Sequence, residues 1–177
     1  MIVFVIWLKL TIFALMYKAR KYRIYPTNSQ KELIHKHCGS VRFLYNLALE
    51  TKTMAYLGSK VNLSRYDLQK QVVDLKKELT WLKETNSQSL QVALLDLDTA
   101  YSNFFKGRAD FPKFKKKSNR GSFNIPQNVI IENDLLIIPK FKEGIKIKLH
   151  RDIVGTIKQC TVSFTPTGKY FVSILCD

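Results

Sequence analysis

The acidic residues and histidines, whose side chains most often do chemistry, are not spaced as a recognisable active site. Asp96 and Asp98 are two residues apart in a segment of helical periodicity, so they point to different faces and cannot share one metal ion. His35 and His37 have the same spacing, and His37 falls on an apolar stripe, where a hydrogen-bonded core histidine is the usual role. No glycine-rich phosphate loop, HExxH motif or zinc-ligand spacing is present. We therefore predict no catalytic residue, no metal site and no cofactor within this chain.

The three cysteines also argue against redox or metal chemistry. Cys38, Cys160 and Cys176 form no C-x-x-C pair and no disulfide framework. Isolated cysteines of this kind usually behave as small core residues, and they suit a reducing compartment. We therefore expect a cytoplasmic protein.

The strongest chemical feature is an uneven excess of basic residues. The 177 residues include 29 Lys or Arg and 14 Asp or Glu, a formal net charge of +15. Residues 16–60 hold nine basic and two acidic residues, residues 108–121 hold six and one, and residues 61–107 hold six of each. A charge so far from neutral predicts a polyanionic partner, and its distribution predicts that residues 16–60 and 108–121 bind it.

Aromatic residues are interleaved with the basic ones in both segments. The stretch YKARKYRIY covers 17–25, and Phe114 lies inside the run KFKKK at 113–117. This pattern suits phosphate contact together with base stacking. Neither segment forms an amphipathic helix with a large apolar face, which favours nucleic acid over a membrane surface. The candidate nucleic-acid-binding residues are Lys18, Arg20, Lys21, Arg23, Tyr25, Lys113, Lys115, Lys116, Lys117 and Arg120. The tyrosines could equally be core residues of a barrel strand.

Periodicity and capping signals place these segments among helices and strands. A short basic strand ends at Pro26, and the Thr27–Gln30 spacing is that of a capping box at the start of a helix that ends near Gly58. Ser64 with Asp67 begins a second helix, and Asn86 or Ser87 begins a third that ends near Gly107. After a basic loop over 108–121 the period becomes two, which predicts four or five strands, with hairpins at Asn133-Asp134 and Pro166-Thr167-Gly168.

We therefore predict an α+β fold class, in which an antiparallel β-barrel or open barrel is interrupted by a three-helix insertion. The insertion explains the lone first strand, which would otherwise have no partners. The expected organisation is a first barrel strand over 16–27, the helical insertion over 28–107, and the basic loop with the remaining strands over 108–177.

The first fifteen residues, MIVFVIWLKLTIFAL, form a separate problem. A membrane-spanning helix needs about 20 apolar residues, and this stretch is shorter and carries Lys9 near its middle. Basic residues follow the apolar run instead of preceding it, which does not fit a secretory signal. We expect Met16 to be the true start and residues 1–15 to be a non-native upstream extension. The alternative is a basic protein tethered to the membrane by this segment.

Six motifs, in order, resemble those of one protein family. They are YRIYP at 22–26, RFLYN at 42–46, LTWLKE with NSQ at 79–88, LDLDTA with FF at 95–105, PKFK with SF at 112–123, and LHR with GTIK at 149–158. Together they resemble the TnpB family, the OrfB-type "transposase" proteins of bacterial insertion sequences. The resemblance begins at Met16 and covers the rest of the chain, and its first-helix motif adds Arg42 to the candidate residues.

The resemblance implies an N-terminal portion of an RNA-guided DNA endonuclease. Family members combine a wedge-type β-barrel, a helical recognition insertion also described as a helix-turn-helix, and a RuvC-like nuclease domain. The implied partners are guide RNA and target DNA, without stable membrane association. The acidic metal ligands and the cysteine zinc motif of the family lie beyond Asp177, so divalent metal and zinc belong to longer relatives. The resemblance therefore implies that this chain does not cut DNA on its own.

A free-standing helix-turn-helix regulator of DNA is the main alternative. Recognition helices normally carry Arg, Lys, Asn or Gln toward the groove. The second and third predicted helices are neutral overall, which disfavours this role. No feature of the sequence predicts an oligomeric state.

Overall fold

The computed structural model describes residues 17–177, so the predictions for residues 1–15 and for a start at Met16 lie outside the described residues. The strand β1 (Lys18–Tyr25) is followed by the helices α2 (Asn28–Ser59) and α3 (Arg65–Glu78), the 3₁₀ helix η1 (Thr80–Glu84) and the helix α4 (Ser87–Phe105). Six strands follow: β2 (Gly121–Ile125), β3 (Ile130–Glu132), β4 (Leu135–Ile138), β5 (Phe141–Lys148), β6 (Ile157–Phe164) and β7 (Tyr170–Cys176). The α+β class with a helical insertion is confirmed, but the expectation of four or five later strands was too low.

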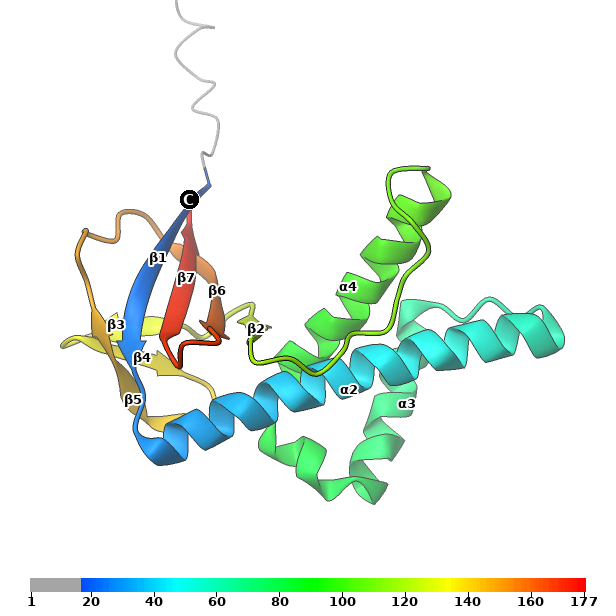
Figure 1. Ribbon diagram of the computed structural model, residues 1–177, viewed down its shortest axis with the longest axis horizontal. Coiled ribbons are helices and arrows are strands. Elements are labelled where there is room, and N and C mark those ends of the chain that lie inside the picture. Colours follow the sequence, from blue (N-terminus) through cyan, green and yellow to red (C-terminus); the bar gives the residue numbers. More distant parts are fainter. Residues whose placement is uncertain (1–16) are drawn as a thin grey trace, which may run out of the picture.

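The strands form one curled antiparallel sheet that is an open barrel. Its order is β2-β6-β7-β1-β5-β4-β3, so β1 lies at the centre between β7 and β5, while β2 and β3 are the edges. Figure 1 shows the sheet curling at one end of the molecule and the helices extending from the other side of it. The first strand therefore pairs within a sheet whose other strands come from the last third of the chain. This arrangement is the one expected if a helical insertion separates the first strand from its partners.

Local signals start the helices where the sequence indicated. The Thr27 hydroxyl accepts the Gln30 N–H at 3.3 Å, and the Gln30 side chain accepts the Thr27 N–H at 3.0 Å. Ser64 and Asp67 make the same reciprocal capping box at the start of α3. The helix α2 runs one residue past Gly58 and closes at Lys60, whose φ of 56° is left-handed.

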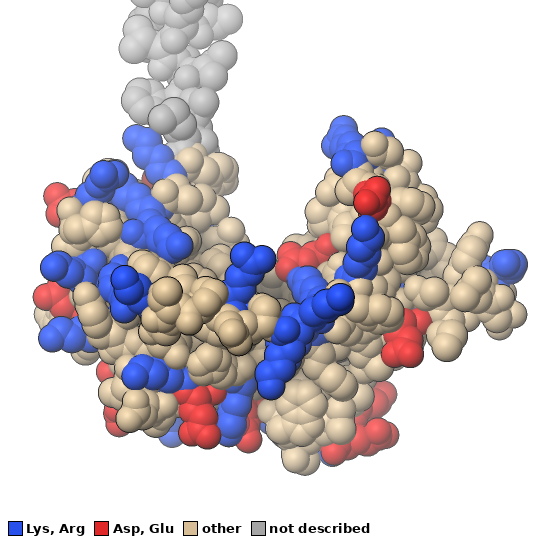
Figure 2. Space-filling model, in the orientation of Figure 1, with Lys and Arg blue, Asp and Glu red and all other residues tan. Residues whose placement is uncertain are grey.

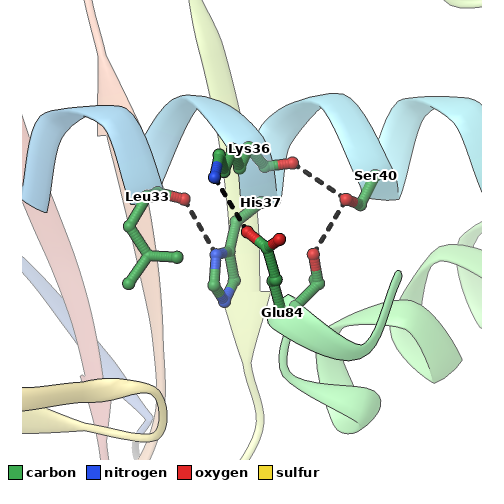
Figure 3. A network of polar contacts seen from close by, with 6 residues as sticks. Leu33, Lys36, His37, Ser40 and Glu84 are labelled. Carbon is green, nitrogen blue, oxygen red and sulfur yellow. Dashed lines mark hydrogen bonds and ion pairs between the residues drawn. The ribbon is translucent and has the colours of Figure 1, made fainter. Parts of the chain in front are cut away.

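A buried histidine joins the helices to the sheet. His37 is fully buried, and its ring lies 4.8 Å from the Phe123 ring and 5.4 Å from the Phe141 ring, measured between centroids. Its Nδ1 donates to the Leu33 carbonyl at 2.9 Å (Figure 3). Its Nε2 accepts the Asn86 N–H at 3.2 Å. Both ring nitrogens are satisfied, which confirms the prediction of a core histidine.

A second set of polar contacts fixes η1 against α2. The Thr85 hydroxyl donates to the Ser40 hydroxyl at 2.8 Å, and Ser40 donates to the Lys36 carbonyl at 2.9 Å. The Lys36 ammonium pairs with Glu84 at 2.9 Å (Figure 3). This ion pair is about half exposed on both sides, so its contribution to stability is small. The buried hydroxyls thus fix η1 on α2 within the insertion, while the ring contacts of His37 join α2 to the sheet.

The cysteines are core residues, as predicted. Cys38, Cys160 and Cys176 are free and buried. Burial raises the pKa of Cys38 and of Cys160 to about 12, so these thiols are poor nucleophiles at neutral pH.

Candidate nucleic-acid interface

The alternation of β1 divides its predicted residues between two faces of the sheet. Lys18 and Arg20 share the inner face with the buried Tyr22 and Ile24. The Arg20 guanidinium donates to the Asp152 carbonyl, and the Tyr22 hydroxyl donates to the Arg151 carbonyl at 3.2 Å. Arg20 therefore holds the connection between β5 and β6 at one end of the barrel.

Lys21, Arg23 and Tyr25 lie on the outer face of β1, where aromatic rings accompany the charges. The Lys21 Nζ lies 4.5 Å from the centroid of the Phe171 ring, and the Arg23 guanidinium lies 5.1 Å from the same ring. The guanidinium also lies 5.6 Å from the Tyr25 ring. Tyr25 is exposed, whereas Tyr22 is core. Lys21, Arg23 and Tyr25 thus form, with Phe171 of β7, one cluster on the outer face of the sheet.

Strand pairing extends this cluster into a row across five strands. Arg23 is directly opposite Lys148 on β5 and Phe171 on β7, Phe171 is opposite Ser163 on β6, and Ser163 is opposite Ser122 on β2. Directly paired residues point to the same face of a sheet. At about 4.8 Å per strand, the row is roughly 19 Å long. We call Lys148, Arg23, Phe171, Ser163 and Ser122 the cross-strand row.

A basic groove lies between α2 and the loop that precedes β2. Its volume is about 590 Å³. The predicted residues that line it are Arg42, Lys115, Lys116, Lys117 and Arg120. Figure 2 shows Lys and Arg side chains gathered in a band between the barrel and the helices, where this loop passes. Ser122 also lines the groove, so the cross-strand row ends at the basic groove.

Within the groove Lys115 differs from its neighbours because it contacts the helices. Its ammonium lies 4.0 Å from the Tyr45 ring centroid and 4.0 Å from the Asp96 carboxylate. Partial burial lowers the pKa of Lys115, and the attraction of Asp96 offsets only part of that effect. Among residues 17–177, no ion pair engages Arg42, Lys116, Lys117 or Arg120. Those four cations are therefore available to a polyanion.

Lys113 is the loop residue that does not line the groove. Its ammonium pairs with Asp110 at 3.4 Å, and both side chains are more than four-fifths exposed. Such a pair contributes little to stability. Of the eleven predicted residues, five therefore line the basic groove, and Lys21, Arg23 and Tyr25 lie on the outer face of β1. Lys18 and Arg20 lie on its inner face, and Lys113 belongs to neither surface.

Three residues on the outer face were missed by sequence reasoning: Lys146, Lys148 and Phe171. Lys146 lies opposite Tyr25, and Lys148 and Phe171 flank Arg23. The alternation of Lys146 and Lys148 with isoleucines is typical of a strand with one apolar and one polar face. What the sequence did not show is that β5 pairs with β1, more than 100 residues away.

The structure also shows where the acidic residues considered as metal ligands lie. Asp96 faces the basic loop, while Asp98 lines a different surface between α2 and α4. Across residues 17–177 no group of three or more His, Cys, Asp or Glu side chains is arranged to hold a metal ion. In that same part of the chain, no helix has the length and apolar character needed to cross a membrane.

The fold and these surfaces define a class of α+β protein in which a helical insertion interrupts an open antiparallel barrel, with a basic groove at the junction. Residues 16–60 match a family described as the helix-turn-helix domain of OrfB proteins of IS605 elements. The chain belongs to the TnpB/OrfB family of insertion-sequence proteins, as its six motifs indicated. In the structure the matched segment is the strand β1 and the single helix α2.

Three relatives illustrate how much of the family this chain represents. A Streptomyces pristinaespiralis protein provisionally named an RNA-guided DNA endonuclease is 34% identical over 166 residues, which is 90% of this chain and 41% of that protein. The Escherichia coli K12 protein InsQ, also provisionally named an RNA-guided DNA endonuclease, is 33% identical over 89% of this chain and 40% of its own length. The virulence protein VsdF of Salmonella dublin is 39% identical over 116 residues, which is 59% of this chain and 98% of VsdF. The chain therefore spans about two-fifths of the first two relatives.

Proposed function

We propose that this chain is the nucleic-acid-binding N-terminal part of a TnpB-like RNA-guided DNA endonuclease and that it acts in the cytoplasm. In this role the barrel and the helical insertion hold guide RNA and target DNA. The names of the two longer relatives support the proposal, as does the basic groove. The residues that cut DNA, with their divalent metal and zinc, would belong to the part of those relatives that this chain does not match.

The observation that carries the proposal is the junction of the cross-strand row with the basic groove at Ser122. Because of this junction, Lys148 and Arg23, which lie in the middle of the sheet, are on the same surface as the groove cations. A phosphate backbone that follows both surfaces would meet positive charge at each end and an aromatic ring between them. Bound phosphates release condensed counterions, which makes such binding strong at low salt and sequence-independent.

The test is a salt titration of binding with matched charge variants. We would measure the affinity for single-stranded RNA and for duplex DNA between about 50 and 200 mM salt. Replacing Lys115, Lys116, Lys117 and Arg120 with Gln should weaken binding and reduce the slope of log K against log salt by roughly 0.7 to 0.9 for each phosphate that is no longer neutralised. Replacing the exposed Lys70, Lys77, Lys83 and Lys169 with Gln removes the same charge elsewhere and should change the slope much less.

An equal effect of the two quadruple variants would contradict the assignment of the groove, because it would show that only net charge matters. For cleavage, the chain incubated with a guide RNA, target DNA and Mg²⁺ should leave the DNA intact. Reproducible cleavage that disappears on chelation would show that the chain itself holds a nuclease site.

A free-standing DNA-binding regulator is a second candidate, and the length of VsdF favours it. VsdF is matched over 98% of its length by part of this chain, so a family relative exists that is little longer than the matched segment. Selection of binding sites from a random duplex library separates the candidates. Recovery of one duplex motif, bound more tightly than RNA of equal length, would support the regulator. Preference for structured RNA would support the guide-binding role.

A further inference from the structure

An aromatic groove lies between the C-terminal halves of α2 and α4, away from the basic groove. Its volume is about 740 Å³. The aromatic residues that line it are Tyr56, Tyr101, Phe104, Phe105 and Phe111. Phe105 is 75% exposed, Tyr56 55% and Phe111 45%, so several rings are open to solvent. A cluster of exposed rings of this size indicates a binding surface.

Positive charges lie over the rings of the aromatic groove. The Lys52 Nζ is 5.1 Å from the Tyr101 ring centroid, and the Lys60 Nζ is 5.1 Å from the Tyr56 ring centroid. The Lys52 ammonium also donates to the Leu63 carbonyl, but an apolar protein surface placed here would remove both ammonium groups from water without giving either a counter-ion, which is costly. A nucleotide instead offers a base that stacks on a ring and a phosphate that pairs with an ammonium. The charge pattern thus favours a nucleotide occupant.

The polar lining of the groove indicates which part of a nucleotide would enter. Asp98, Asn62 and Ser102 lie among the aromatic residues. A carboxylate repels a phosphate but accepts hydrogen bonds from the amino groups of bases. The arrangement therefore suits a base inside the groove with its phosphate at the basic rim.

The loop after α4 connects the aromatic groove to the basic groove. Phe111 lines the first, and Lys115 lines the second. Four residues span at most about 14 Å of extended chain. A single nucleic-acid strand whose phosphates follow the basic groove can therefore bring a neighbouring unstacked base to the aromatic groove.

We propose that the aromatic groove binds unstacked bases of a single-stranded nucleic acid. The proposal rests on the nucleic-acid binding proposed above, and it adds a site for bases to the surfaces that bind phosphates. Stacking on exposed aromatic side chains tolerates any sequence, because every base has an aromatic face.

The experiment compares two oligonucleotides of equal charge. The probes are fluorescently labelled oligo(dT) and the same oligonucleotide with abasic residues at several central positions. Wild-type protein should bind oligo(dT) about 5- to 100-fold more tightly than the abasic probe, because each stacked base adds to affinity. Phe105→Ala should reduce oligo(dT) binding by a similar factor and leave both abasic binding and the salt slope unchanged.

Two further variants control for stability and for general loss of apolar surface. Phe105→Trp keeps a stacking ring, so it should retain the affinity, and its added tryptophan fluorescence should be quenched by oligo(dT) but not by the abasic probe. Leu95→Ala removes an exposed apolar side chain from the same helix outside the groove and should have no effect.

Equal binding of the two probes, or an unchanged oligo(dT) affinity in Phe105→Ala, would overturn the proposal. If salt-dependent binding to both probes persisted in that case, the proposed function would stand and only the aromatic groove would lose its role. If the protein bound neither oligo(dT) nor the abasic probe, both the base site and the proposed nucleic-acid-binding function would be rejected. Self-association of the chain that disappears in Phe105→Ala, with oligo(dT) binding intact, would assign the groove to contact between copies.

Discussion

The side chain of Asn46 on α2 holds the backbone of Lys115 in the basic loop by two hydrogen bonds. Its Nδ2 donates to the Lys115 carbonyl at 3.0 Å, and its Oδ1 accepts the Lys115 N–H at 2.8 Å. Asn46 ends the RFLYN motif and Lys115 ends the PKFK motif, so two segments almost 70 residues apart meet at one amide. The shape of the basic groove depends on this contact, because Lys115 and the residues after it form one wall.

Asn46→Ala should release the loop from α2. Each hydrogen bond contributes about 1 kcal/mol, and this partly exposed pair should contribute less than two full bonds. We expect a modest loss of stability together with faster trypsin cleavage at 113–117 and weaker RNA binding. Asn46→Asp keeps the acceptor for the Lys115 N–H but places a carboxylate against its carbonyl, so it should restore protection only in part.

Asn119→Ala, an exposed substitution in the same loop, is the matched control. It should leave both the trypsin pattern and the affinity unchanged. If Asn46→Ala were equally silent, the loop would be held by its other contacts, chiefly those of the Lys115 ammonium with Tyr45 and Asp96.

The burial of His37 predicts a loss of stability in mild acid. Burial lowers the pKa of His37 below its usual value of 6.5, because the charged imidazolium would lose its hydration in the core. The unfolded chain then binds a proton more readily than the folded one. The contribution of His37 to stability is therefore complete above about pH 6.5 and declines as the pH falls from there toward the lower folded-state pKa. Urea unfolding between pH 7.5 and 5 measures the decline.

His37→Leu separates this effect from other titrations. The variant leaves the Asn86 N–H without its acceptor, which should cost about 1 to 3 kcal/mol at neutral pH. The difference from wild type should shrink as the pH is lowered, because only the wild type loses stability through this ring. A difference that stays constant with pH would show that His37 does not govern the acid response.

Features encoded over a few residues could be predicted from the sequence. The capping boxes at Thr27 and Ser64 involve partners three residues apart, so the starts of α2 and α3 were evident. The Asn133-Asp134 hairpin needs only two residues that tolerate positive φ, and both adopt it. The 3₁₀ helix η1 was not predicted, because its shape is set by the buried contact between Thr85 and Ser40, 45 residues apart.

Features that depend on strand pairing could not be predicted. Alternation along β1 separates Lys21 and Arg23 from Arg20, but it does not say which face is covered. That depends on pairing with β5 and β7, whose registers have no local signal. For the same reason the sequence grouped Arg20 with Arg23, although one holds a loop of the barrel and the other lies on the outer face.

Turn geometry predicts that adding a glycine in one hairpin stabilises the protein, whereas removing a glycine from another destabilises it. Asp134 has a φ of 57° and Gly168 a φ of 68°. Asp134→Gly should stabilise the protein by about 0.5 kcal/mol, because glycine adopts this region without strain and suits the second position of a two-residue hairpin. Gly168→Ala should destabilise it by about 1 kcal/mol through left-handed strain.

Gly39→Ala provides the contrast for these turns. Gly39 lies within α2, and an added methyl group would meet nothing within 4 Å. Alanine favours the helix by about 1 kcal/mol over glycine, so this variant should be stabilised. Thermal or urea unfolding of the three variants tests the set; a stabilised Gly168→Ala would mean that the turn between β6 and β7 does not require positive φ.

Lys148→Glu should strengthen the fold while it weakens nucleic-acid binding. Lys148 lies directly opposite Arg23 in the sheet, and two like charges at a directly paired position destabilise it. Glutamate there would face the Arg23 guanidinium, and the change should add about 0.5 kcal/mol to the free energy of unfolding.

The same change puts a negative charge in the cross-strand row, so binding should weaken and its salt dependence should decrease. Lys142→Glu makes the same charge change on β5 outside the row, and it should affect binding much less. Because stability and binding move in opposite directions, weaker binding in Lys148→Glu could not be attributed to unfolding, whereas unchanged binding would exclude the row from the interface.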